Sequence, residues 1–446
     1  MGAAVVARKY PPGPSRAVPL VAHLSMLRNP LRFLERAART HGDLVHLRLG
    51  SRHDYLVNRP DLVRDVLLAP EEQLHRSFPR TMKRVLGQGL LSSQGAYHRS
   101  QRRLIQPFFH HRRMAPFGEV ITSRASRLCD RWRDGEVVDV APEMLHLTLQ
   151  IAIQAVFDRD LDDGGTELLE ALAPLVATTR KRRLHLADHL PAGLPFGPAR
   201  TQELALARLD AFIHGLIQSR RREGEAHPDL LSLLLEVSAD QDEKVADEMV
   251  RDETITMFSA GHETIANCLA WTFLLLAQHP EVESALHGEV DALPAVPGFE
   301  DIPRLRYTAM VLNESMRLYP PVWLMVRRPV EDFPLGEYLV PRGAYIHVSQ
   351  WLMHRDPRYF PEPLRFDPLR WTPEAEAARP KYCYFPFGGG GRKCIGEGFA
   401  LAEGVLALAT IARRYRLRLV PGQRIEPEPF VTLRPKYGMT MRLHRR

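Results

Sequence analysis

The hydrophobic residues change their period along the chain. Residues 44–49 tend to alternate apolar and polar side chains, Gly50-Ser51 favours a turn, and an apolar run follows at residues 55–57. Two short strand-like runs joined by a turn predict an antiparallel β-hairpin. From Arg99 to about Gly288 the apolar residues recur at helical spacing instead, and this stretch is predicted to be a long helical block.

Short strands are predicted again in the last third of the chain. After Pro320-Pro321, strands are expected at residues 338–340 and 345–348. A proline-rich meander follows at residues 357–386, where regular helix is not expected because proline lacks the backbone N–H donor.

The end of the chain is predicted to hold a last helix at residues 398–415 and a strand pair around Val431 and Met439. No repeat, low-complexity tract or Gly/Ser linker divides the sequence. We therefore expect a proline-rich lead at residues 1–14 and one α+β domain at residues 15–446, mostly helical with small sheets at one side.

Composition favours a globular protein without a nucleic-acid partner. Hydrophobic residues make up 45% and charged residues 25% of the chain, as is typical of folded domains. The net charge is +7, but the basic excess is spread over the whole sequence rather than gathered in one patch. Nucleic-acid-binding proteins normally concentrate positive charge on one face.

The sequence also predicts a cytoplasmic location. No window reaches the roughly 18 apolar residues of a spanning helix, and the first ten residues are too polar for a secretory signal, so no integral membrane anchor is expected. The chain has four cysteines, without the density or spacing of an extracellular disulfide framework.

The most unusual segment surrounds Cys394. Four consecutive glycines, Gly388 to Gly391, precede Arg392, Lys393 and this cysteine. Glycine lets a backbone approach another group closely. Cationic neighbours and the N-terminus of a following helix would stabilise a thiolate. We interpret Cys394 as a metal ligand.

Two other interpretations of this segment are weaker. A free cysteine is more often a small buried hydrophobe, a role that we assign to Cys129, Cys268 and Cys383. A phosphate-binding P-loop is disfavoured because it needs Ser or Thr after Gly-Lys, whereas Lys393 follows Arg392 and precedes Cys394. A dinucleotide-binding motif is disfavoured because residues 396–398 supply only two of its three glycines and no apolar strand precedes them.

A second segment places Gly261 inside a long helical pattern, next to Glu263 and Thr264. Glycine costs a helix about 1 kcal/mol relative to alanine, so a nearby ligand or a local opening of the helix must offset it. Glu263 and Thr264 are candidates for proton relay. The alternative is a solvated glutamate beside a threonine that bonds to its own helix.

Glu314 and Arg317 form a third candidate pair at i, i+3 spacing, which alone carries little information.

Taken together, the three segments resemble the cytochrome P450 family over nearly the whole chain. The heme-binding signature Phe-x-x-Gly-x-Arg-x-Cys-x-Gly is matched at each fixed position: Phe387, Gly390, Arg392, Cys394 and Gly396. Residues 260–264 resemble the oxygen-activation motif, and residues 363–371 resemble the meander that supplies Arg370 to the Glu-x-x-Arg pair.

The resemblance implies a heme-thiolate monooxygenase with a cytochrome P450-like fold and heme between two long helices. Cys394 would be the axial thiolate of heme b. Glu263 and Thr264 would deliver protons during oxygen activation, and Ala260 and Gly261 would leave room for the oxygen.

By the same resemblance, cationic or polar side chains would hold the heme propionates: His98, Arg102, Arg327 and Arg392. His98 departs from the tryptophan that the family often has at this position. Glu314, Arg317 and Arg370 would form a structural ion-pair triad.

No flavin or ferredoxin segment is fused to the chain, so electrons from NAD(P)H are expected through an external ferredoxin and ferredoxin reductase, with the protein a monomer. A basic patch would dock an acidic ferredoxin. Its residues would be Arg99, Arg102, Arg103, Arg112, Arg113 and Lys393.

The substrate is expected to be an apolar small molecule, hydroxylated at a C–H bond or epoxidised at a double bond. The candidate pocket residues are mostly large and apolar: Phe78, Met82, Leu86, Met257, Phe258, Trp323, Leu324, Met325 and Phe430. The overall pattern looks most like bacterial hydroxylases of terpenoid secondary metabolism, although some of these residues can simply fill the core.

Three alternatives remain at this point. A fatty-acid or polyketide hydroxylase would use Lys83, Arg84 or residues 180–183 to meet a carboxylate. A peroxide-driven enzyme would lack the acid and alcohol pair at Glu263 and Thr264. A non-catalytic heme sensor would need only Cys394.

Overall fold

The computed structural model describes residues 10–14, 25–26, 28–49, 52–160, 198–223 and 227–446. Their contacts divide the chain into two compact units. The first, here the strand-rich unit, comprises residues 1–77, 310–394 and 427–434, and the second, the helical unit, comprises residues 78–309, 395–426 and 435–446. Because each unit is assembled from separate stretches, neither is an independent segment of sequence. The single domain at residues 15–446 stays a prediction, and residues 1–9 of the predicted lead lie outside the described residues.

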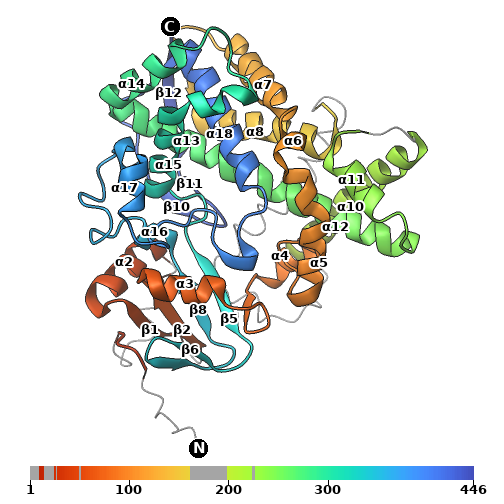
Figure 1. The fold of residues 1–446 in the computed structure, drawn as a ribbon, viewed down its shortest axis with the longest axis vertical. Coiled ribbons are helices and arrows are strands. Elements are labelled where there is room, and N and C mark those ends of the chain that lie inside the picture. Colours follow the sequence, from red (N-terminus) through yellow and green to blue (C-terminus); the bar gives the residue numbers. More distant parts are fainter. Residues whose placement is uncertain (1–9, 15–24, 27, 50–51, 161–197, 224–226) are drawn as a thin grey trace, which may run out of the picture. The chain divides into compact units, whose positions relative to one another are not determined.

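The strand-rich unit is built on a five-stranded sheet with the order β1-β2-β8-β5-β3 (Figure 1). Its strands are β1 (Leu44–Leu49), β2 (Arg52–Val57), β3 (Leu74–Arg76), β5 (Met325–Pro329) and β8 (Tyr345–Val348). The predicted hairpin is confirmed, since β1 and β2 pair antiparallel. Its turn, residues 50–51, lies outside the described residues.

Helices and small strand pairs complete this unit. Helix α2 (Pro30–His41) is capped at its N-terminus by Asn29, whose side chain accepts a hydrogen bond from the Arg32 N–H. Apolar residues of α2, α3 (Pro60–Leu68) and the main sheet form the buried clusters of the unit. The remaining elements that lie wholly within it are β6 (Phe333–Leu335), β7 (Tyr338–Val340), α16 (Gln350–Met353), η5 (Pro368–Trp371), α17 (Pro373–Ala377), η6 (Gly390–Arg392) and β10 (Pro427–Pro429). Helix α15 (Arg306–Leu318) and strand β11 (Leu433–Pro435) each run across a boundary between the units.

In the helical unit the predicted helical block is confirmed for its described residues, while residues 161–197 and 224–226 of the block lie outside them. Its helices up to residue 304 are α4 (Arg80–Leu86), α5 (Gly95–Ile105), η1 (Gln106–Phe109), α6 (His111–Met114), α7 (Phe117–Arg131), α8 (Val140–Phe157), α10 (Pro198–Glu223), α11 (Leu230–Val237), α12 (Glu243–Gly261), α13 (Glu263–Gln278), α14 (Pro280–Asp291) and η4 (Phe299–Arg304). The last helix, α18 (Glu397–Arg414), packs against α7, α13 and α14. A small sheet with the order β4-β12-β9 joins β4 (Val137–Asp139), β12 (Thr440–Arg445) and β9 (Tyr415–Leu419).

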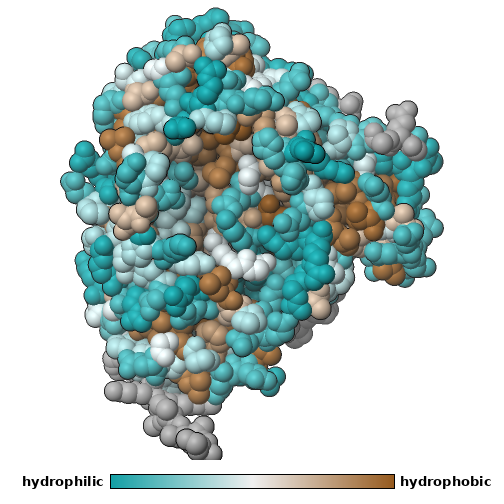
Figure 2. All heavy atoms as spheres, viewed as in Figure 1, coloured by the Kyte–Doolittle hydropathy of each residue, from teal (hydrophilic) through white to brown (hydrophobic). Residues whose placement is uncertain are grey.

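Helix α8 is apolar enough to be compared with a membrane span, but 61% of it is buried inside the protein. It packs against α13, α12 and α7, so its apolar character serves the core. On the face drawn in Figure 2, hydrophilic residues predominate and hydrophobic residues lie in separate patches.

Two local predictions are wrong. Val431 and Met439 do not belong to one strand pair: Val431 lies in the turn between β10 and β11, whereas Met439 precedes β12, which pairs with β4 and β9. The meander also contains regular turns, since η5 and α17 each begin at a proline, where the missing N–H donor costs nothing.

Candidate functional site

Cys394 lies at the end of a closed loop in the strand-rich unit. Its backbone N–H donates to the Phe387 carbonyl oxygen at 2.9 Å, and the Lys393 N–H donates to the Gly390 carbonyl oxygen at 3.0 Å. Helix α18 begins shortly afterwards, with Gly396 as its N-cap. The loop therefore fixes the cysteine at the entrance to a helix, as the sequence predicts.

Cys394 differs from the other three cysteines in exposure. It is exposed, while Cys129, Cys268 and Cys383 are buried. Burial raises the pKa of the Cys129 and Cys268 thiols to about 12 and that of Cys383 to about 11, so they stay protonated and inert. Only Cys394 is placed to act as a thiolate ligand.

The signature glycines pack against the end of α3. Gly390 has φ +66°, and a Cβ atom there would lie 2.2 Å from the Leu67 carbonyl oxygen. At Gly389 a Cβ atom would lie 2.9 Å from the Tyr382 ring. The close approach inferred from the glycine run is therefore, for these residues, an approach to protein backbone and side chains.

Three arginines gather near Cys394 within the strand-rich unit. Arg76 on β3 stands directly opposite Arg327 on β5 in the antiparallel ladder, so both side chains emerge on the same face. Burial and the repulsion by Arg327 and Arg392 lower the pKa of Arg76 to about 9. The negative charges of Cys394 and Glu71 act in the opposite direction and raise it. Burial and Arg392 lower the pKa of Arg327 to about 10.

This cluster fits heme on two counts. Guanidinium groups pair well with carboxylates, and heme b carries two propionates. Among the described residues no three or more His, Cys, Asp or Glu side chains form a metal-binding group. A single exposed thiolate matches a metal whose other ligands come from a macrocycle.

Arg76 was missed by the sequence analysis. It lies outside the matched motifs, in a short strand of a chain rich in arginine. The register of β3 against β5 alone reveals its position, because sequence does not specify which strands pair.

The long helical pattern is interrupted at His262, between α12 and α13. The Thr264 hydroxyl donates to the Ala260 carbonyl oxygen at 3.1 Å, and the Thr148 hydroxyl of α8 donates to the His262 carbonyl oxygen at 3.0 Å. These hydroxyls occupy backbone acceptors around the opening. The local opening that Gly261 suggested is present.

Packing does not require a glycine at position 261. A Cβ atom there would meet no heavy atom within 4 Å among its described neighbours, and the residue is exposed. Glu263 and Thr264 are half-buried beside it. The structure therefore brings Ala260, Gly261, Glu263 and Thr264 together at one accessible break.

His262 serves the helix itself. Its Nδ1 lies 2.8 Å from the Phe258 carbonyl oxygen, and its ring contacts the Phe258 ring with centroids 5.1 Å apart. Burial lowers its pKa, so the ring is neutral and Nδ1 is the donor to that carbonyl.

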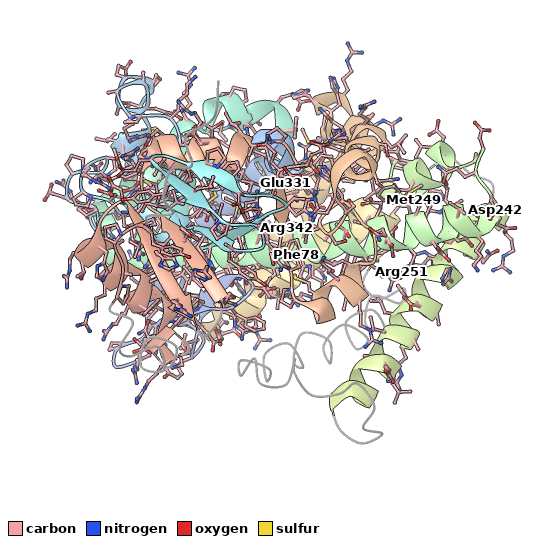
Figure 3. All side chains as sticks on the ribbon, turned by 90° about the horizontal axis from the view of Figure 1, so that it is seen from below. Phe78, Asp242, Met249, Arg251, Glu331 and Arg342 are labelled. Atoms are coloured by element: carbon pink, nitrogen blue, oxygen red, sulfur yellow. The ribbon has the colours of Figure 1, made fainter. Side chains whose placement is uncertain are left out.

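Three consecutive side chains of α12 hold the end of α4 and the residues that follow it. Arg251, labelled in Figure 3, donates to the Val85 carbonyl oxygen at 3.0 Å, and Asp252 accepts from the Gln88 N–H at 2.6 Å. Glu253 accepts from the Leu90 N–H at 2.8 Å. Burial raises the pKa of Glu253 to about 8. This clamp is not predicted from the sequence, because nothing local specifies which backbone groups α12 contacts.

The predicted pocket residues fall into both units. In the helical unit Leu86 and Phe258 are buried core residues, with Met82 and Met257 packed against the same cluster, while Phe78 is half-buried. In the strand-rich unit the Trp323 indole N–H donates to the Phe430 carbonyl oxygen at 2.9 Å. Leu324 and Met325 are half-buried in that unit.

The structure joins Glu314, Arg317 and Arg370. Arg317 binds Glu314 through two hydrogen bonds of 2.7 and 2.8 Å, and both side chains are fully buried. The Arg370 Nε lies 3.4 Å from Glu314 Oε1. Arg317 also donates to carbonyl oxygens at positions 354, 363 and 365, which ties α15 to the meander.

On α5, His98 and Arg102 share one face at i, i+4 spacing, with His98 buried and Arg102 half-buried. The predicted docking residues Arg99, Arg103, Arg112 and Arg113 are exposed on α5 and α6, and Lys393 is exposed in the strand-rich unit. A shallow open depression of the helical unit is lined by Arg103, Gln106, Pro107, His110, Arg112 and Arg113. Residues 180–183, considered for carboxylate binding, lie outside the described residues.

Comparison with known proteins agrees with this geometry. The family model Cytochrome P450 matches residues 11–441. Cyclooctatin synthase of Streptomyces melanosporofaciens is 39% identical over 424 residues, covering 93% of this chain and 92% of that protein. Cyclooctat-9-en-7-ol 5-monooxygenase of the same organism is 38% identical and covers 91% of this chain and 89% of that protein. Pentalenene oxygenase of Streptomyces avermitilis is 31% identical, with 96% of each chain covered.

Solved structures show the same fold. The retinoic acid bound cyanobacterial CYP120A1 superposes with a TM-score of 0.86 at 24% identity, covering 99% of this chain and 100% of that one. The cytochrome P450DA heme domain gives a TM-score of 0.83 at 24% identity, with 99% of each chain covered. The exposed thiol, the arginine cluster and these matches lead to one conclusion: the chain belongs to the cytochrome P450 family, whose members are oxidoreductases that bind heme through a cysteine thiolate.

Proposed function

We propose that this protein is a monooxygenase that hydroxylates or epoxidises a cyclic terpenoid. The observation that carries the substrate class is the 31–39% identity, over nearly the full chain, to relatives that modify terpenoids. The apolar side chains of Leu86, Met257 and Phe258 also support a terpenoid substrate, because an apolar ligand gains binding energy chiefly by burying its surface.

The heme would be held by Cys394 as axial ligand and by cationic partners for its propionates. Arg76, Arg327 and Arg392 of the strand-rich unit are the partners that the cluster supports, and His98 and Arg102 of the helical unit remain predicted partners. When bound, heme supplies the reductive activation of dioxygen.

The chain's own contribution is proton delivery at the opening between α12 and α13. The Thr264 hydroxyl is anchored to the Ala260 carbonyl oxygen, which fixes its oxygen atom as an acceptor and relay position. Glu263, the preceding residue, is half-buried and can exchange protons with solvent. Gly261 leaves the space beside this relay free of a side chain.

Electrons are proposed to come from NAD(P)H through a ferredoxin reductase and an acidic ferredoxin. The depression lined by Arg103, Arg112 and Arg113 supports this, since exposed cations steer acidic partners to a surface. A cytoplasmic location is part of the same proposal.

The ligand is tested by the carbon monoxide difference spectrum of the reduced protein, compared with Cys394→Ser and with Cys383→Ser as the matched control. We expect the strongly red-shifted Soret band in the wild type and the control, and its loss in Cys394→Ser. A wild-type spectrum without the thiolate band, or one that Cys394→Ser leaves unchanged, would refute heme-thiolate catalysis.

The substrate class is tested by titrating the ferric protein with pentalenene and with a long-chain fatty acid while the Soret band is followed. We expect pentalenene to shift the Soret band more strongly than the fatty acid does. The opposite order would favour a fatty-acid hydroxylase.

A further inference from the structure

Glu71 forms a buried ion pair with Arg392 of the heme-binding signature. Its Oε2 lies 2.8 Å from the Arg392 Nη2, and the two side chains are only 8% and 6% exposed. Glu71 lies in the turn between α3 and β3, which is closed by hydrogen bonds of Gln73 and Leu74 to the Pro70 carbonyl oxygen. Burying a charge pair is costly, so its presence calls for a specific explanation.

The turn that carries Glu71 is fixed against the signature loop. Gly390 and Gly389 abut Leu67, in the last turn of α3, and a Cβ atom at Gly391 would lie 3.6 Å from Glu71 Oε1. The loop and the turn therefore hold each other at backbone distance. These contacts keep Glu71 within reach of Arg392.

Glu71 is also a counter-charge for the whole arginine cluster. Its charge raises the pKa of both Arg76 and Arg327, against the lowering by burial and by the neighbouring arginines. Arg76, Arg327 and Arg392 together carry three positive charges, of which Glu71 offsets one. Within the strand-rich unit, two net positive charges therefore remain for the heme propionates.

We propose that Glu71 is a positioning residue for the heme: it holds Arg392 in place and offsets its charge, which lowers the reduction potential of the heme. This inference rests on the proposed heme binding. A negative charge near the iron disfavours the added electron, so removing it favours reduction.

The test is a spectroelectrochemical titration of the heme-loaded protein, comparing wild type with Glu71→Gln. We expect the midpoint potential of Glu71→Gln to shift to a more positive value. Glu72→Gln is the matched control, because Glu72 is exposed and adjacent in sequence; its potential should equal that of the wild type. Glu71→Asp, which keeps the charge, should restore most of the wild-type value.

A purely structural role is separated by urea unfolding of the apoprotein and the ferric holoprotein. Glu71→Gln should destabilise the apoprotein more than the holoprotein, because propionate can replace the missing carboxylate only in the latter. Equal losses in both forms with an unchanged potential would overturn the inference.

If Glu71→Gln does not fold, the same charge is tested in the Arg392→Gln background, where removal of the Glu71 charge leaves no unpaired Arg392. Adding Glu71→Gln to Arg392→Gln should raise the potential, and no difference between these two variants would refute the inference. A wild type without a thiolate spectrum would refute the proposed function as well, whereas a normal wild-type spectrum with unchanged potentials would refute this inference alone.

Discussion

Arg76 and Arg327 face each other across the β3–β5 ladder, and their charges repel while burial removes water from both. Like charges in direct cross-strand register normally destabilise a sheet. Both pKa values stay above 8, so both arginines are cationic at neutral pH. The pair is explained if an anionic group completes it, as the heme propionates would.

The variant Arg76→Gln tests this explanation. It should make the apoprotein equally stable or more stable, because a repelled cation is removed, while heme affinity falls roughly 10–100-fold, equivalent to one charge-assisted hydrogen bond. Heme transfer to apomyoglobin and urea unfolding of the apoprotein measure the two effects. Arg328→Gln is the control, since Arg328 is an exposed arginine of the paired strand β5, next to Arg327; equal heme loss in both variants would contradict the prediction.

The hydroxyl of Thr264 is expected to couple electron use to product formation. In Thr264→Val, product per NAD(P)H consumed should fall about tenfold or more, with hydrogen peroxide released instead, because a proton relay is lost. Thr264→Ser should retain coupling. Thr272→Val removes an equivalent bond, from the Thr272 hydroxyl to the Cys268 carbonyl oxygen on the same helix, and should change stability without changing the coupling ratio.

The buried carboxyl group of Glu253 should make the free energy of unfolding depend on pH. Its pKa is raised to about 8 in the folded protein, so the folded state binds a proton that the unfolded state releases. The free energy of unfolding should therefore decrease from about pH 5 to pH 8. Glu253→Gln keeps the acceptor for the Leu90 N–H, cannot ionise, and should flatten this decrease by an amount on the order of a few kcal/mol.

Urea unfolding at several pH values measures this effect. Glu248→Gln, exposed on the same helix, should keep the wild-type slope. Parallel pH profiles for wild type and Glu253→Gln would show that Glu253 is ionised in the folded protein at neutral pH.

The ion pair of Glu314 and Arg317 should be essential for stability. Arg317→Gln leaves a fully buried carboxylate with reduced compensation, and a loss of about 3–5 kcal/mol is expected. Arg365→Gln breaks the pair with Glu362, which has the same i, i+3 spacing but is 63–72% exposed, and should cost less than about 1 kcal/mol. Denaturant midpoints compare the two, and similar losses would show that burial does not decide the strength of these pairs.

Several features could be predicted because their signals are local: the hairpin of β1 and β2, the helical block, and the position of Cys394 just before α18. Alternation, helical spacing and glycine runs act within a few residues. The terminal strand pair was mispredicted for the opposite reason, since the partners of β12 are β4 and β9, of which β4 lies about 300 residues earlier. Likewise, residues 314 and 317 show their spacing in sequence, but not that they are buried under the meander.

Sequence alone determined the family, and it predicts the thiolate ligand and the relay residues, because these signals depend on residue types at fixed short spacings. Tertiary structure decided the charge environment: that Arg76 opposes Arg327, that Glu71 reaches Arg392, and that Glu253 is buried beneath Leu90. Charge interactions depend on distance and burial, and both are set by which distant segments pack together.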